Sequence, residues 1–187
     1  MVLQKWQALS LAQRFVIKAL GCVVVWKVLY QTWLYPSRIF DKPLTQIVAN
    51  GTAWMINFLD SKSPILATCS QEIVVRGETF INVMRGNYSL IAIADACNGL
   101  ELMVMYVGLI VLLPYSNARK WWFAIVGSLL LIVTNVLRCV GLQWVYVHYR
   151  AYFETSHHYL FTLAMYVVIF FGWTLYVKKE NQVDAKG

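Results

Sequence analysis

Long apolar runs dominate the chain and predict membrane-spanning helices. The first run covers residues 11–34, long enough to cross a hydrocarbon core of ~30 Å at ~1.5 Å per residue. Three further runs, at 99–113, 121–147 and 159–177, follow in the second half of the chain. Short connections between the later runs favour antiparallel neighbours. The pattern therefore predicts about four transmembrane helices.

A helical segment of another kind follows the first run. The dipeptide Tyr35-Pro36 predicts a break, after which residues 43–59 show a moderate apolar stripe. The residues on the predicted apolar face are Leu44, Ile47, Val48, Met55, Phe58 and Leu59. Such a helix is better suited to lying in the membrane interface than to crossing it. A second short span is the alternative for this segment.

Residues 60–96 form the one extended polar stretch. Within it, residues 71–83 alternate β-branched and polar side chains, and residues 90–94 resume a β-like apolar pattern. Turns are expected at Arg76-Gly77 and at 85–87, which predicts two or three short strands. The expected fold is therefore an all-α polytopic membrane protein with an interfacial helix and a small extracytoplasmic β-rich cap.

Composition supports the membrane assignment. Hydrophobic residues make up 59% of the 187 residues and charged residues 13%, whereas soluble domains carry roughly 25% charged residues. So little polar surface excludes a soluble enzyme, a nucleic-acid-binding module and a disordered protein. The net charge of +7 comes mostly from bases beside the apolar runs. Their position beside the apolar runs predicts that the lipid bilayer is the partner and that the protein binds no nucleic acid.

The distribution of charge predicts the orientation. Bases outnumber acids at alternate ends of the four runs, at Lys5, Arg14, Arg119, Lys120, Lys178, Lys179 and Lys186. The positive-inside rule then places both termini in the cytoplasm. The chain is expected to be one integral membrane domain, 1–187. Its parts are an anchor (1–34), an extracytoplasmic helix and cap (35–96), a helical region (97–177) and a cytoplasmic tail (178–187).

The four cysteines show no metal-binding spacing. No CxxC or Cys/His pair occurs, so a zinc site is not expected. Cys22 and Cys139 lie inside apolar runs and are predicted to be small core residues. Cys69 and Cys97 face the extracytoplasmic side in this topology, and the pattern leaves open whether they form a disulfide.

Three kinds of reactive side chain are predicted at one depth near the outer surface. Cys97 opens the second span, and Arg138 lies 18 residues beyond Lys120, or roughly 27 Å along the helix. His157 and His158 precede the last span. A helix N-terminus and an arginine both favour a thiolate, and a histidine can exchange its proton. Together they predict a Cys/His/Arg site for acyl transfer.

Non-catalytic interpretations compete with this one. An arginine inside a span normally has a partner, and Glu101, one turn from Cys97, is the obvious candidate. A structural Arg138–Glu101 ion pair would suit a non-catalytic membrane assembly or export factor. A small transporter would instead use Lys27, Glu101 and Arg138 as a charge path, although no internal repeat supports one.

Three sequence blocks resemble the exosortase/archaeosortase family of membrane transpeptidases. They are Asp95-Ala-Cys-Asn-Gly-Leu-Glu101, Asn135-Val-Leu-Arg138 and the His157-His158 pair. The similarity covers roughly residues 65–177, and the size resembles the compact Bacteroidota-type exosortases. Asn98 stands where many members have serine, which suggests a subgroup.

The resemblance implies roles for individual residues. It makes Cys97 the nucleophile, Arg138 its electrostatic partner and His158 the general acid/base, with His157 as the rival. His158 is preferred because it lies closer to the start of the final span. The supporting residues carried over from the motifs are Asn98, Gly99, Glu101 and Asn135.

The resemblance also implies the reaction and the partners. Substrates would be exported proteins with a C-terminal sorting signal: a short motif, a transmembrane helix and a basic tail. Cleavage at the outer face of the cell inner membrane would pass through a thioester. An envelope amine or a lipid or glycan acceptor would then resolve it, with hydrolysis as the fallback. No metal and no cofactor are required.

Overall fold

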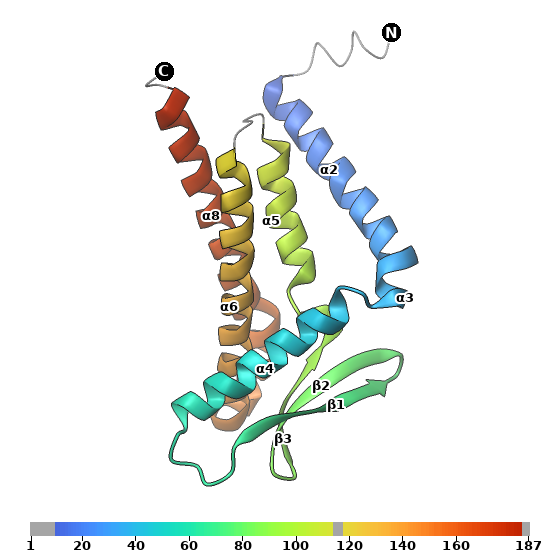
Figure 1. Cartoon of the computed structure of the whole chain (residues 1–187), viewed down its shortest axis with the longest axis vertical. Helices are drawn as coiled ribbons and strands as arrows, with labels where there is room; N and C mark the ends of the chain where they lie inside the picture. Colours follow the sequence, from blue (N-terminus) through green and yellow to red (C-terminus); the bar gives the residue numbers. More distant parts are fainter. Residues whose placement is uncertain (1–9, 114–117, 185–187) are drawn as a thin grey trace.

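The computed structural model describes residues 10–113 and 118–184. Figure 1 shows a group of long helices with a helix and a small sheet lying across one end of them. The long helices are α2 (Leu11–Leu29), α6 (Ala118–His148) and α8 (Phe161–Asp184), and the shorter α5 (Leu100–Leu112) lies among them. The transverse helix is α4 (Asp41–Leu59). The described chain is thus mostly helical.

The N-terminal helix is longer than its predicted end at Tyr35-Pro36. Its start is fixed by a capping box, in which Ser10 and Gln13 each bind the other's backbone N–H. The helix then continues through a π-helical turn, η1 (Tyr30–Leu34), and the short α3 (Tyr35–Ser37). Pro36 stands in the first turn of α3, directly after the wider π-helical turn, and such a turn relieves the clash that proline creates. The chain reverses at Arg38, which has a left-handed φ of 51°.

Three helical stretches in the described residues are long and apolar enough to cross a membrane. They are Gln13–Ser37, Arg119–His148 and Arg150–Lys179. The last comprises η3 (Arg150–Tyr152), α7 (Phe153–Thr155), η4 (Ser156–Leu160) and most of α8. The fourth predicted span corresponds to α5, whose 13 residues measure about 20 Å, less than the ~30 Å hydrocarbon core.

Tyr106 of α5 holds the helical group together. Its ring lies directly on Gly127 of α6 and against Gly172 of α8, and its side chain is almost fully buried. The Tyr106 hydroxyl donates a hydrogen bond of 2.9 Å to the carbonyl oxygen of Phe123. Two glycines therefore let α6 and α8 approach α5 on both sides of one aromatic ring.

The predicted strands are present as a three-stranded antiparallel sheet in the order β1-β2-β3. The strands are β1 (Ala67–Val75), β2 (Glu78–Arg85) and β3 (Tyr88–Ala94). The turns fall at 76–77 and 86–87, as expected, and Arg76, Gly77 and Gly86 take the positive φ angles of tight hairpins. Pairing of Val75 with Glu78 and of Arg85 with Tyr88 sets the register.

The residues predicted to form one apolar face of the amphipathic helix divide between two sides of α4. Its buried residues are Asp41, Leu44, Thr45, Val48, Ala49, Thr52, Ala53 and Ile56, whereas Ile47, Phe58 and Leu59 are exposed. Small side chains allow close packing on this face: Gly51 lies directly against Val136 of α6. The Thr52 hydroxyl donates a hydrogen bond to the Val48 carbonyl oxygen, so this buried polar group has a partner.

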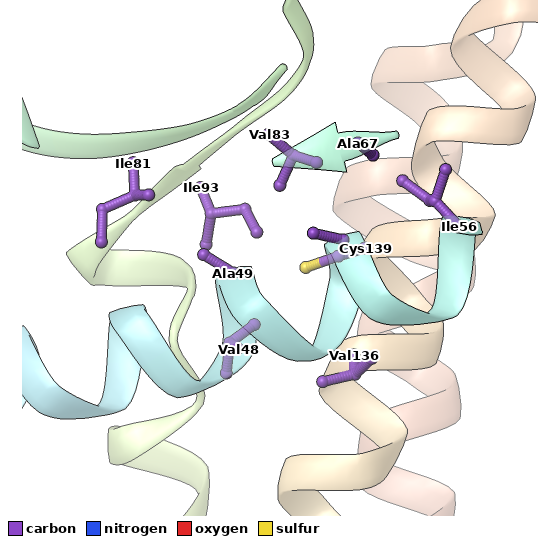
Figure 2. Close-up of a cluster of buried hydrophobic side chains, with 10 residues drawn as sticks. Val48, Ala49, Ile56, Ala67, Ile81, Val83, Ile93, Val136 and Cys139 are labelled. Atoms are coloured by element: carbon purple, nitrogen blue, oxygen red, sulfur yellow. The ribbon is translucent and has the colours of Figure 1, made fainter. Parts of the chain in front are cut away.

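Figure 2 shows the apolar cluster that joins α4, the sheet and α6. Its labelled members are Val48, Ala49, Ile56, Ala67, Ile81, Val83, Ile93, Val136 and Cys139. Cys139 is a core residue as predicted, but Cys22 is exposed on α2. All four cysteines are free thiols in the structure. This cluster fixes the sheet and α4 to the spanning helices.

We expect Gly127→Ala to destabilise the protein by about 1–3 kcal/mol, because the new methyl group would overlap the Tyr106 ring. The thermal unfolding midpoint of the purified protein in detergent measures this effect. Gly108→Ala in α5 is the matched control, since open space surrounds that position. An equal midpoint for the two variants would contradict the packing role of Gly127.

Candidate active site

Cys97 lies in a tight turn between the sheet and α5. β3 ends at Ala94, and the next residues form the single-turn 3₁₀ helix η2 (Asp95–Cys97). Gly99 then adopts a φ of +88°, a conformation that glycine takes without strain. Cys97 was expected at a helix N-terminus, but α5 begins only at Leu100. A backbone turn, rather than the first turn of a helix, positions the thiol.

His157 is the histidine that faces Cys97. Its Nε2 atom lies 3.9 Å from the Cys97 Sγ atom, and its ring stacks parallel to Phe153. His158 points elsewhere, with its Nε2 atom 3.4 Å from a Glu154 carboxylate oxygen. Adjacent residues in a helical turn project in different directions, so only one of the pair can reach the thiol. The sequence favoured His158 as the residue beside Cys97, whereas the geometry favours His157.

Asn135 connects Cys97 to Arg138. The Asn135 side chain is fully buried, and its Nδ2 atom donates a 2.9 Å hydrogen bond to the Cys97 carbonyl oxygen. Its Oδ1 atom accepts a 3.3 Å hydrogen bond from Nη1 of Arg138. The predicted Asn-x-x-Arg block therefore does contact the cysteine turn, through the asparagine.

The predicted Arg138–Glu101 ion pair is not formed. Glu101 pairs instead with Lys27 of α2, at 2.6 Å between Oε1 and Nζ. The two helices approach each other at this point, which sequence spacing could not reveal. Among the described residues, Arg138 has no carboxylate within ion-pair distance, and its buried Nε atom has no hydrogen-bond partner. Its charge also acts on the nearby His157 ring.

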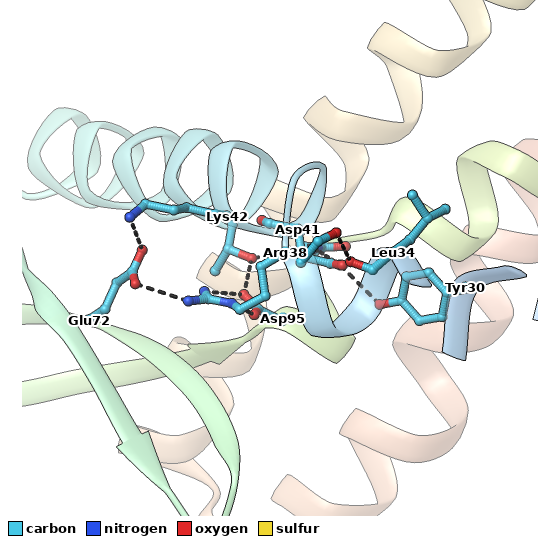
Figure 3. A network of polar contacts seen from close by, with 10 residues as sticks. Tyr30, Leu34, Arg38, Asp41, Lys42, Glu72 and Asp95 are labelled. Carbon is cyan, nitrogen blue, oxygen red and sulfur yellow. Dashed lines mark hydrogen bonds and ion pairs between the residues drawn. The ribbon is translucent and has the colours of Figure 1, made fainter. Parts of the chain in front are cut away.

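A second polar network holds the cysteine turn from the other side (Figure 3). The guanidinium of Arg38 binds the buried Asp95 carboxylate through two contacts, at 2.7 Å from Nε and 3.2 Å from Nη2. Its Nη1 atom also binds Glu72 of β1 at 3.0 Å. The Thr45 hydroxyl donates a third bond to Asp95 at 2.7 Å. Asp95, two residues before the nucleophile candidate, is thus tied to α4, β1 and the turn after α3.

The hydrogen bond from Arg38 holds the pKa of the Glu72 carboxyl below its usual range. A lowered pKa stabilises the fold above the pKa that the carboxyl has when unfolded, near ~4.3. This contribution is lost as the pH falls through the folded-state pKa. The network is therefore intact at neutral pH.

Asn98 fastens the same turn to α4. Its Nδ2 atom donates a 2.8 Å hydrogen bond to Oδ1 of the buried Asp41, which also accepts one of 3.0 Å from the Tyr30 hydroxyl. The Asn98 Oδ1 atom accepts a hydrogen bond from the backbone N–H of Leu100. A serine at this position would be too short to make both contacts, so the asparagine has a structural role here.

Sequence reasoning did not identify Arg38, Asp41 or Thr45 as part of the site. Asp95 entered it only as the first residue of the sequence block that contains Cys97. A usable signal was present, because acids and bases next to apolar segments are stable when buried only if they are paired. The partners, however, are 57 residues apart in the chain.

The arrangement combines a thiol, an imidazole and a guanidinium without a carboxylate partner. A thiol beside a histidine is the pattern of a nucleophile with its base, and an unpaired arginine suits a developing negative charge. Within the described residues, no group of three or more His, Cys, Asp or Glu side chains has the geometry to hold a metal ion.

Comparison with models of known families gives a match. The sequence model of the transmembrane exosortases (Exosortase_EpsH) matches residues 6–177. It extends the similarity through the N-terminal helix, beyond the region that carries the three blocks. No curated protein and no solved structure matches the chain. Since the matched region covers most of the sequence, the chain belongs to the transmembrane exosortase family and is an integral membrane protein.

Proposed function

We propose that this exosortase is a cysteine transpeptidase that cleaves C-terminal sorting signals of exported proteins. Membership of the family supports a membrane transpeptidase of the sortase-like kind. The observation that carries the proposal for this chain is the approach of His157 Nε2 to Cys97 Sγ, at 3.9 Å. This distance is long for proton transfer, but such contacts commonly tighten when substrate binds.

In the proposed reaction, His157 accepts the thiol proton as Cys97 attacks the scissile carbonyl carbon. A C–S bond forms, and the C–N bond of the peptide then breaks. His157 returns the proton to the leaving amine, so the basic tail departs with its transmembrane helix. The remaining thioester is resolved by an acceptor amine or, failing that, by water, which regenerates the thiol.

Arg138 is proposed to stabilise the oxyanion of the tetrahedral intermediates. Its Nε atom has no hydrogen-bond partner among the described residues, which supports this role, because such a donor is available to a transient negative charge. Asn135 is a positioning residue: it holds Arg138 with one end of its amide and the Cys97 backbone with the other. Glu101, engaged by Lys27, takes no part in the chemistry.

The charge pattern supports the proposed topology. Both termini lie in the cytoplasm, and the site lies on the extracytoplasmic side of the cell inner membrane. Substrates are exported proteins that present a motif, a transmembrane helix and a basic tail. The acceptor is an envelope amine or a lipid or glycan group.

Replacing Cys97 with Ala should abolish release of a tagged C-terminal tail from a co-expressed substrate, because the proposed thioester forms on the Cys97 thiol. Immunoblotting of the tail measures release. Cys22→Ala is the matched control, since Cys22 is an exposed thiol on α2 remote in sequence from the site. Unchanged release by Cys97→Ala, with normal membrane abundance, would refute the enzymatic proposal.

The two adjacent histidines provide a paired test. His157→Ala should slow tail release by about 10²–10⁴-fold, the usual contribution of a general acid/base. His158→Ala should leave most of the rate, since that side chain contacts Glu154 at the surface. Initial rates from purified enzyme in detergent measure both. A larger loss from His158→Ala would reverse the assignment.

Arg138→Lys tests the planar donor group at constant charge. Lysine cannot supply the Nε and Nη donors together, so we expect a loss of about 10²–10³-fold in kcat, as for removal of an oxyanion donor. Arg150→Lys, at a position where the guanidinium lies over the Tyr146 ring, is the control. Full activity of Arg138→Lys would show that charge alone is sufficient there.

A further inference from the structure

The exposed side of α4 carries an apolar stripe that no other part of the described chain covers. We define this outer stripe as Ile47, Trp54, Phe58 and Leu59, each more than half exposed. Trp54 and Phe58 stack on each other with ring centroids 5.7 Å apart. The opposite side of α4 is buried against the sheet and α6. Contiguous exposed apolar surface of this kind marks a place of interaction.

The stripe continues beyond the helix. Ile65 and Leu66, in the connection to β1, are exposed to a similar degree. Two exposed lysines accompany these residues: Lys42 lies in the first turn of α4, and Lys62 lies in the connection between Leu59 and Ile65. Aromatic rings combined with flanking cations are the composition of a helix seated between acyl chains and anionic headgroups.

The position of α4 along the spanning helices agrees with a location at the membrane interface. Counting from Lys120, about 20 residues of α6 at ~1.5 Å each cross the ~30 Å hydrocarbon core and end near residue 140. α4 contacts α6 just before that level, where Gly51 lies against Val136 and Cys139 joins the cluster with Val48. Figure 1 shows α4 crossing α6 transversely. It therefore lies where the hydrocarbon ends.

A bilayer accounts for the outer stripe better than a protein partner does. Val133 and Leu137 flank the Val136 contact on α6, and both are exposed within a membrane-spanning helix. The apolar surface of α4 thus adjoins a surface that the bilayer already covers. Tryptophan, moreover, is enriched at this depth in membrane proteins.

We propose that the outer stripe of α4 is seated in the lipid interface at the end of the spans where Cys97 lies, and holds the cysteine turn at the hydrocarbon boundary. The link is direct: Asn98 binds Asp41, and Thr45 binds Asp95, so the turn is fastened to the inner side of α4. If the proposed function holds, this depth places the nucleophile level with the peptide bonds that immediately precede a substrate's transmembrane helix.

The test uses the full chain in vesicles of phosphatidylcholine and phosphatidylglycerol. A spin label is attached at Trp54→Cys in a background with the four native cysteines replaced by alanine, and collision rates with oxygen and a water-soluble nickel chelate are compared. Leu129→Cys, about 14 Å along α6 from Lys120, is the mid-bilayer control. Asn87→Cys, in the exposed turn between β2 and β3, is the aqueous control.

The expected ratio of oxygen to nickel collisions at Trp54→Cys lies between the two controls, several-fold above that at Asn87→Cys. A ratio equal to either control would overturn the proposal, by placing α4 in water or within the hydrocarbon. A second measurement does not depend on the labelled variants folding correctly. Lipids brominated near the headgroup should quench the tryptophan fluorescence of the wild type more than that of Trp54→Phe. Equal quenching would also overturn it. Neither measurement depends on activity, so failure of the proposed function is scored separately.

Discussion

The buried ion pair between Arg38 and Asp95 is the interaction on which the site depends. Asp95 is almost fully buried, and an unpaired carboxylate there would be unstable. Removing one partner of such a pair typically costs roughly 3–5 kcal/mol. The pair also has a geometric effect, because Arg38 simultaneously holds Glu72 of β1. The end of the N-terminal helix, the sheet and the cysteine turn are thereby fixed to one guanidinium.

The remaining components of the site come from the spanning helices. Asn135 of α6 grips the Cys97 carbonyl, and His157 reaches the thiol from the π-helical turn before α8. Their mutual placement rests on the packing of α5, α6 and α8 around Tyr106. The cysteine turn is thus held by a charged network on one side and by close-packed helices on the other.

Several charged side chains gather around the cysteine turn. Arg38, Asp41, Asp95 and Arg138 all lie around the cysteine turn, where α4 crosses the helices. Buried charges are costly in a membrane domain and persist where they have partners or tasks. Arg38 and the two aspartates have partners. Arg138 has only Asn135 among the described residues, which is the physical basis for assigning it a role with substrate.

Local patterns in the sequence by themselves predicted most of the helices and the sheet. Two or three strands were expected and three are present. Four spans were expected, whereas three described stretches are long enough to cross a membrane and α5 is shorter. Apolar runs, alternation and turn residues are local signals, and local chain geometry converts them directly into helices and hairpins. The three family blocks likewise identified Cys97, Arg138 and the histidine pair. The local pattern did not predict which side of α4 is buried. That side carries several threonines and alanines, because close packing on α6 and the sheet requires small side chains.

Only the tertiary structure decided which of these residues meet. Position in the sequence favoured His158, which lies closer to the last span, but in the folded chain His157 faces Cys97 and His158 contacts Glu154. Spacing also suggested an ion pair between Arg138 and Glu101, but α2 lies close to α5 and Glu101 pairs with Lys27 instead. Arg38 and Asp95 lie 57 residues apart, and their pairing exists only once α4 and the sheet have packed. Long-range contacts depend on how whole elements dock, and no local pattern in the chain records that.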